Sequence, residues 1–99
     1  MTLHQVVWKH TVGIGATITV YFPPPARVTM VQVDRVDPQY VHFWVAHPEP
    51  GDVDPDVFQE NLATFEIVGT GHPFPLDWEV LGSCADPGRP LIWHLVRHV

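Results

Sequence analysis

The segment with the greatest potential for chemistry is Gly69-Thr70-Gly71-His72-Pro73, which follows an alternating apolar run. A glycine-rich turn can present backbone N–H groups to an anion, and a histidine on it can transfer a proton. A phosphate-binding loop also needs a lysine and a hydroxyl at fixed spacing, however, and a dinucleotide fingerprint needs a following helix. Pro73 and Pro75 prevent a regular helix here. We therefore predict a tight turn that ends a strand, with a ligand or partner contact as the alternative.

Alternate carboxylates at Asp52, Asp54 and Asp56 match the opening of a calcium-binding loop. The rest of that motif is missing, because Val57 occupies the glycine position and Ala63 the position of the bidentate glutamate. We predict a solvated acidic loop over residues 49–60, with these three aspartates as weak calcium candidates and no other metal site. The sequence does not indicate what the loop does.

Seven histidines raise the possibility of zinc binding or of a pH-dependent charge. His94 and His98 are four residues apart, which on a strand separates them by about 13 Å, too far for one metal ion. His42 and His47 fall on opposite faces of a regular strand. The sequence therefore indicates packing histidines, and it does not show whether they make the protein pH-dependent.

The candidate nucleophiles are Ser83 and Cys84, but neither has the local sequence that would activate it. Ser83 lacks a nucleophile elbow, and Cys84 does not precede a helix that would lower its pKa. The carboxylates of Glu66, Asp77 and Glu79 could serve acid–base chemistry only if the fold brought them together. We predict a non-enzymatic protein without a cofactor.

Composition limits the partners and the compartment. The 99 residues include eleven acids against five Lys and Arg, for a formal charge of −6, which opposes binding to nucleic acid. A single cysteine excludes an internal disulfide, and no apolar run is long enough to span a bilayer. The N-terminus lacks the pattern of a secretion signal. We expect one β domain over residues 1–99, located in a virion or in the host cytoplasm, with no membrane association.

Period-two alternation of apolar residues predicts seven short strands. The expected strands are 5–10, 16–22, 27–34, 40–46, 64–68, 78–84 and 91–98. Asp86-Pro87-Gly88 predicts a hairpin between the last two. Asp54 and Pro55 suit the cap and first position of one short helical turn within residues 54–62. The fold class is therefore all-β: a small antiparallel sandwich or partly open barrel.

Two of these strands carry apolar residues on both faces. The interface candidates they contain are Phe43, Trp44, Trp93 and Leu95. Because a small sandwich buries only one face of each strand, the second faces need a cover. Either the acidic loop folds over one of them, or other loops do, or another subunit does. We predict a homo-oligomer or a docking surface, since tryptophan is enriched at interface hot spots. The oligomeric state and the partner's identity cannot be read from the sequence.

The chain resembles an uncharacterised family of small proteins encoded mainly by tailed bacteriophages and prophages. The nine-residue signature Phe65-Glu66-Ile67-Val68-Gly69-Thr70-Gly71-His72-Pro73 carries most of the resemblance. Shorter matches occur in order at Trp8-Lys9, Pro25-Ala26-Arg27, Gln32-Val33, Phe43 to Pro48 and Trp93-His94. The resemblance implies a viral context and gives no catalytic residues. The segment 51–62 is longer than the family pattern.

Two classes of function follow. The first is a virion structural component, such as a capsid decoration protein, that contacts itself and a viral structural protein. The second is a soluble inhibitor of host defence that binds a host protein or sequesters a small signalling nucleotide. In the second class, either the acidic loop would mimic the charge of a nucleic acid, or the Gly-Thr-Gly-His turn would line a ligand pocket with Arg89 or Arg97.

Overall fold

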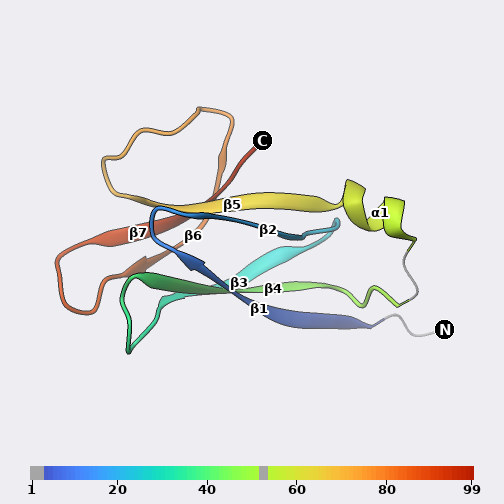
Figure 1. Ribbon diagram of the computed structural model, residues 1–99, viewed down its shortest axis with the longest axis horizontal. Helices are drawn as coiled ribbons and strands as arrows, with labels where there is room; N and C mark the ends of the chain where they lie inside the picture. The colour runs from blue at the N-terminus through green and yellow to red at the C-terminus, as the bar shows by residue number, and fades with distance from the viewer. Residues whose placement is uncertain (1–3, 52–53) are drawn as a thin grey trace.

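The computed structural model describes residues 4–51 and 54–99. It contains seven strands and one helix in the order shown in Figure 1. The strands are β1 Gln5–Gly13, β2 Thr17–Tyr21, β3 Arg27–Val33, β4 Tyr40–Pro48, β5 Leu62–Gly69, β6 Glu79–Ala85 and β7 Ile92–Arg97, and the helix is α1 Pro55–Glu60. All seven predicted strands are confirmed, with ends that differ by a few residues.

The strands form two antiparallel sheets that pack face to face. The three-stranded sheet has the order β1-β4-β3, and the four-stranded sheet has the order β2-β5-β7-β6. Figure 1 shows the two sheets as an upper and a lower layer. The predicted all-β sandwich is therefore confirmed. The predicted hairpin is also present as β6 and β7, which pair on either side of the turn at Asp86-Pro87-Gly88.

The core lies between the sheets and is built from the alternate residues of each central strand. Val41, Phe43 and Val45 of β4 face it from one sheet, and Phe65 and Leu95 face it from the other. Phe43 and Phe65 are fully buried, with ring centroids 5.4 Å apart. Burying an aromatic side chain of this size stabilises a fold by about 1.5–3 kcal/mol.

The short helix begins as the sequence predicted. Asp54 is the N-cap, and its side chain accepts a hydrogen bond from the N–H of Asp56, while Pro55 occupies the first turn. Phe58 of α1 stacks on Tyr21 with ring centroids 4.6 Å apart. The helix therefore packs at one end of the sandwich. The possibility that the acidic segment covers a sheet face is wrong for its described residues.

The segment 70–78, which joins β5 to β6, covers a sheet face instead. Figure 1 shows it arching over the four-stranded sheet on the side away from the core. On that outer face Val68 and Val96 are buried, and Trp78 of the segment stacks on His98. Within the described residues, no helix is long and apolar enough to cross a membrane.

Candidate functional site

Three of the four predicted interface residues lie in the core. Phe43 and Leu95 are completely buried and Trp93 is 9% exposed, so none of them can anchor a partner on the folded protein. The prediction is wrong for these three because each strand has two apolar faces, and the sequence pattern does not say which one turns inward. Trp44 lies on the other face of β4, pointing away from the core.

Trp44 is the centre of an uncovered sheet face, the Trp44 face. Its members are Val7, Lys9 and Thr11 of β1, Tyr40, His42, Trp44 and Ala46 of β4, and Arg27, Met30 and Gln32 of β3. Lys9 and Met30 flank Trp44 directly in the register of the sheet. Val7 is 55% exposed and Met30 is 49% exposed. Among the described elements in Figure 1, none lies beneath this sheet.

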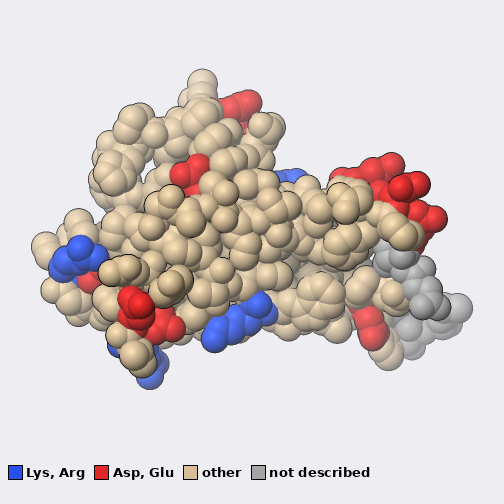
Figure 2. Space-filling view, viewed as in Figure 1, with Lys and Arg blue, Asp and Glu red and all other residues tan. Residues whose placement is uncertain are grey.

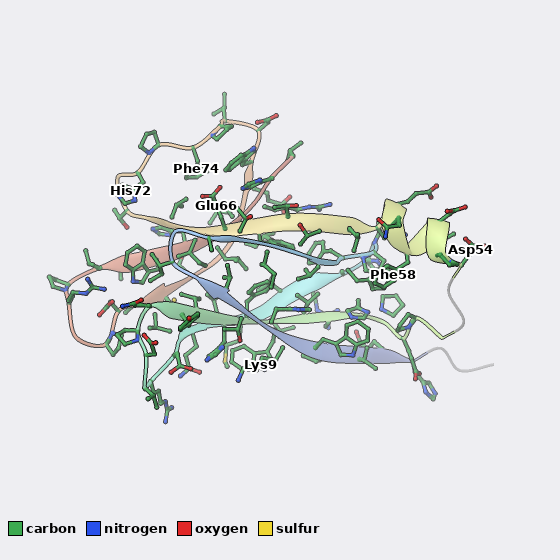
Figure 3. All side chains as sticks on the ribbon, in the orientation of Figure 1. Lys9, Asp54, Phe58, Glu66, His72 and Phe74 are labelled. Atoms are coloured by element: carbon green, nitrogen blue, oxygen red, sulfur yellow. The ribbon has the colours of Figure 1, made fainter. Side chains whose placement is uncertain are left out.

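The Trp44 face carries positive charge on an acidic protein. Lys9 Nζ lies 5.7 Å from the centroid of the Trp44 ring, a cation–π contact. Arg27 donates to Gln5 Oε1 at 3.4 Å and thereby spans the strand between them, covering Ala46. Within the described part of the chain, neither cation forms a salt bridge. Figure 2 shows several acidic side chains at the end of the molecule where α1 lies and others spread over the surface, and Figure 3 shows Lys9 at the lower edge of the β1-β4-β3 sheet.

A histidine network borders the apolar centre of this face. His42 Nδ1 lies 2.8 Å from Thr11 Oγ1, and His42 Nε2 lies 2.7 Å from Asp34 Oδ2. The N–H groups of Asp37 and Val36, followed by His42, lower the pKa of Asp34 to about 2. Because this carboxylate is ionised, Nε2 of His42 donates a hydrogen bond to it.

Thr11, His42 and Asp34 supply the hydroxyl, imidazole and carboxylate of a nucleophilic triad, but their surroundings differ from those of a catalytic triad. Thr11 lies on a flat strand, where the neighbouring backbone N–H groups lie in the plane of the sheet and cannot converge on an oxyanion above it. Three hollows on the described structure are lined by other residues and not by Thr11, His42 or Asp34. We interpret the network as a cross-strand support that fixes the β3–β4 turn beside Trp44.

The signature turn, Gly69 to Pro73, is a tight turn that follows the end of β5, as the sequence predicts. The N–H of His72 donates to the carbonyl of Gly69 at 3.0 Å, and His72 Nδ1 accepts from the N–H of Gly69 at 3.2 Å. Gly71 has φ of +90°, which an L side chain rarely adopts. A Cβ at Gly69 would lie 3.1 Å from His72 Nδ1 and 3.2 Å from the Trp93 ring. The structure therefore explains why glycine occupies positions 69 and 71. Pro73 follows in the segment 70–78 that covers the sheet.

A second histidine network lies on the outer face of the four-stranded sheet. His94 Nδ1 is 2.7 Å from Ser83 Oγ, and His94 Nε2 is 2.9 Å from Thr70 Oγ1. The fold thus gives Ser83 an imidazole neighbour that the sequence did not predict, although among the residues that the structure describes the ring bonds to two hydroxyls and to no carboxylate. Burial raises the pKa of the neighbouring Cys84 thiol, which favours its protonated form.

Of the three aspartates predicted as weak calcium candidates, Asp54 caps α1 and Asp56 lies in its first turn. Asp52 lies outside the described residues. No group of three or more His, Cys, Asp or Glu residues in the described segments could hold a metal ion. His94 and His98 have separate partners, since His98 Nε2 lies 2.6 Å from Glu66 Oε1.

The two arginines considered for a nucleotide pocket have partners of their own. Arg89 donates to the buried carboxylate of Asp86 at 2.9 Å, and Arg97 lies over the ring of Phe22. Arg89, then the N–H of Gly88 and the Trp93 indole, lower the pKa of Asp86 to about 2. Among the described residues, Arg89 and Arg97 contact partners outside the signature turn.

The residues that sequence reasoning missed act through contacts between distant strands. His42, Thr11 and Asp34 come from three separate segments, so no local motif identifies them. The one local signal was Asp34 at the start of a turn, where an aspartate commonly accepts backbone N–H bonds.

Comparison with known proteins gives a family and no function. Residues 3–99 match the model of a family described as "Domain of unknown function (DUF7352)", and the chain belongs to this family. A search of curated proteins and a search of solved structures found no significant match.

Proposed function

We propose that this member of the DUF7352 family is a non-enzymatic accessory protein of a tailed bacteriophage that acts through protein–protein contacts. Its role would be that of a virion structural component, such as a capsid decoration protein. The resemblance of the signature Phe65 to Pro73 to phage-encoded proteins supports the viral context. A rigid sandwich with an exposed apolar face suits a protein that binds to a surface.

The Trp44 face is the observation that carries this proposal. The chain covers the outer face of its four-stranded sheet with its own segment 70–78, whereas no described element covers the Trp44 face. Trp44, Met30 and Val7 supply apolar contact area, and tryptophan is a frequent interface anchor. A partner that binds to this face would remove its apolar side chains from water, which the described residues of the chain itself do not do.

Charge indicates the chemistry of that partner. Lys9 and Arg27 are held by an aromatic ring and an amide, so their charges remain available to carboxylates on another molecule. The fitting surface is apolar at its centre and acidic at its rim. Such charge complementarity would orient the protein on its partner and suppress wrong contacts.

Mass spectrometry of purified virions tests the proposal. Particles are prepared from phage or induced prophage encoding the wild-type chain, Trp44→Ala, or Val80→Ala as a control on the outer face of the other sheet. We expect the wild type and Val80→Ala in the particles and a loss of at least about tenfold for Trp44→Ala. Absence of the wild type from particles would contradict the virion role, and full retention of Trp44→Ala would contradict the assigned face.

A further inference from the structure

The sandwich has four strands at sheet edges, and three of them carry features that oppose pairing with another chain. β2 has five residues and is followed closely by Pro23-Pro24-Pro25. β3 and β6 each contain a register shift and lie close together, with Val31 against Gly82. Short strands, prolines and bulges are the usual ways in which proteins protect a sheet edge.

β1 has none of these features. It has nine residues without proline, and it pairs with β4 one for one along its whole length, without a register shift. Its only charged residue, Lys9, lies in the middle of the strand and reaches over Trp44 on the sheet face. Val7 and Trp8 are exposed, the latter by 38%. A long regular edge of this kind is a template for strand addition.

The hydrogen bonds at the two ends of β1 identify which backbone groups are free. The N–H of Glu49 donates to the carbonyl of His4 at 3.0 Å, and the N–H of Ile14 donates to the carbonyl of Gln39 at 2.8 Å. Bonding alternates along an antiparallel ladder, so the even-numbered residues of β1 bond to β4. The N–H and C=O groups of Val7, Lys9 and Thr11 therefore point to the free edge.

We propose that β1 is a dimerisation edge, to which β1 of a second copy adds in antiparallel orientation across a two-fold axis at Trp8. The result is a continuous six-stranded sheet that joins two Trp44 faces. This inference uses a different surface from the proposed virion contact and does not depend on a viral role.

The register follows from bonding and charge. The free groups pair only when odd-numbered residues lie opposite odd-numbered residues, so the axis passes through one residue. An axis at Lys9 would place two like-charged lysines directly opposite each other, which is destabilising, and an axis at Val7 would pair fewer residues of β1. An axis at His10 would pair Val7 with Gly13, whose carbonyl already accepts from the N–H of Ala16 at 3.0 Å. An axis at Trp8 places Val7 opposite Lys9 of the second copy, and it brings the two Trp8 side chains together at a non-hydrogen-bonded pair, where side chains are closest.

Sedimentation of the full chain from micromolar to millimolar concentration provides the first test. We expect a concentration-dependent dimer. Val7→Pro removes one edge-facing N–H per copy and no bond to β4, and should weaken the dimer by at least about 100-fold. Thr17→Pro is the matched control, because it also removes an edge-facing N–H, but from β2. The N–H of Phe22 donates to the carbonyl of Asn61, so the even-numbered residues of β2 bond to β5 and the N–H of Thr17 points to the free edge. A wild type that stays monomeric, or grows into open-ended fibres, overturns the proposal, as does a Val7→Pro dimer of wild-type affinity.

Disulfide trapping tests the register and does not require the proline variant to fold. In a Cys84→Ala background, Trp8→Cys should form an intermolecular disulfide with oxidised glutathione, whereas Gln5→Cys should not, since its two copies would be about 20 Å apart. Equal trapping at Gln5 would overturn the proposal, and efficient trapping at Lys9→Cys with none at Trp8→Cys would overturn the Trp8 axis.

Discussion

The indole of Trp78 lies flat on the imidazole of His98, with ring centroids 3.8 Å apart and ring planes 18° apart. His98 in turn bonds to Glu66, so one stack joins the segment 70–78 to the neighbouring strands β7 and β5. Figure 3 shows this segment, with His72 and Phe74, above Glu66. Val68 and Val96 lie on the covered face and are removed from water although they point away from the core.

Trp78→Ala should loosen this cover. We expect the amide hydrogens of residues 70–78 to exchange faster and the free energy of unfolding to fall by about 1–3 kcal/mol, because a half-buried aromatic side chain and its stacking partner are lost. Hydrogen exchange measured by NMR and urea unfolding check both effects. Leu76→Ala in the same segment is the control, since Leu76 is fully exposed. Equal effects in the two variants would show that the stack does not hold the segment.

Much of the fold could be predicted because local rules determine it. Alternation identified the seven strands, and Asp54-Pro55 and Asp86-Pro87-Gly88 identified the helix start and the hairpin turn. The order of strands in the sheets could not be predicted. It depends on pairings such as Trp8 with Val45, between residues far apart in the chain.

The surface was harder to predict than the elements. Trp44 and Trp93 both lie on strands that are apolar on two faces, and only packing shows that Trp93 turns inward while Trp44 turns outward. The cover of the four-stranded sheet comes from the proline-rich segment 70–78 and not from the described residues of the acidic segment, because Trp78 finds a stacking partner in His98. Such partners come from distant strands and leave no local motif.

Gly71→Ala should destabilise the signature turn. Its φ of +90° places an L side chain in a strained conformation, so we expect the free energy of unfolding to fall by about 1–2 kcal/mol. Gly13→Ala is the control, because its added Cβ meets only ordinary contacts at 3.8 Å or more and its φ is not positive. Chemical denaturation of both variants measures the difference. A Gly71→Ala protein as stable as the control would mean that the turn can change its conformation without cost.

Gly82→Ala should disturb the line where β6 meets β3. An added Cβ would lie 2.7 Å from Val31 Cγ2, closer than real contacts allow, and the branched Val31 has few rotamers with which to yield. We expect a loss of about 1–3 kcal/mol from overpacking. Gly88→Ala, whose Cβ would meet its nearest neighbour at 3.9 Å, is the control.

A double-mutant cycle separates this clash from a general effect on β6. Val31→Ala should cost less stability in the Gly82→Ala background than alone, because it removes the atom that the new methyl group strikes. Additive losses would contradict the close approach of the two strands at this point.

We expect His10 to make the stability of the protein depend on pH. Burial, followed by the charge of His47, lowers the pKa of His10, and its Nε2 is buried without a hydrogen-bond partner among the described residues. The unfolded chain then binds a proton at His10 more readily than the folded chain does. The contribution of His10 to stability is therefore fully present above about pH 6.5 and is lost as the pH falls through the lower folded pKa.

His10→Leu removes this titration from the interior, where the ring lies 5.3 Å from that of Phe43. We expect the free energy of unfolding of the wild type to fall more steeply between pH 7.5 and pH 5.5, by about 2.303RT per pH unit at most, than that of the variant. Urea unfolding across this range measures both slopes, with His4→Gln as the control because His4 is exposed. If the free energy of unfolding falls equally with pH in His10→Leu and the wild type, His10 does not cause the pH dependence. We expect the free energy of unfolding to change with pH equally in the wild type and His4→Gln, and less in His10→Leu. That result would assign the pH dependence to the buried ring of His10.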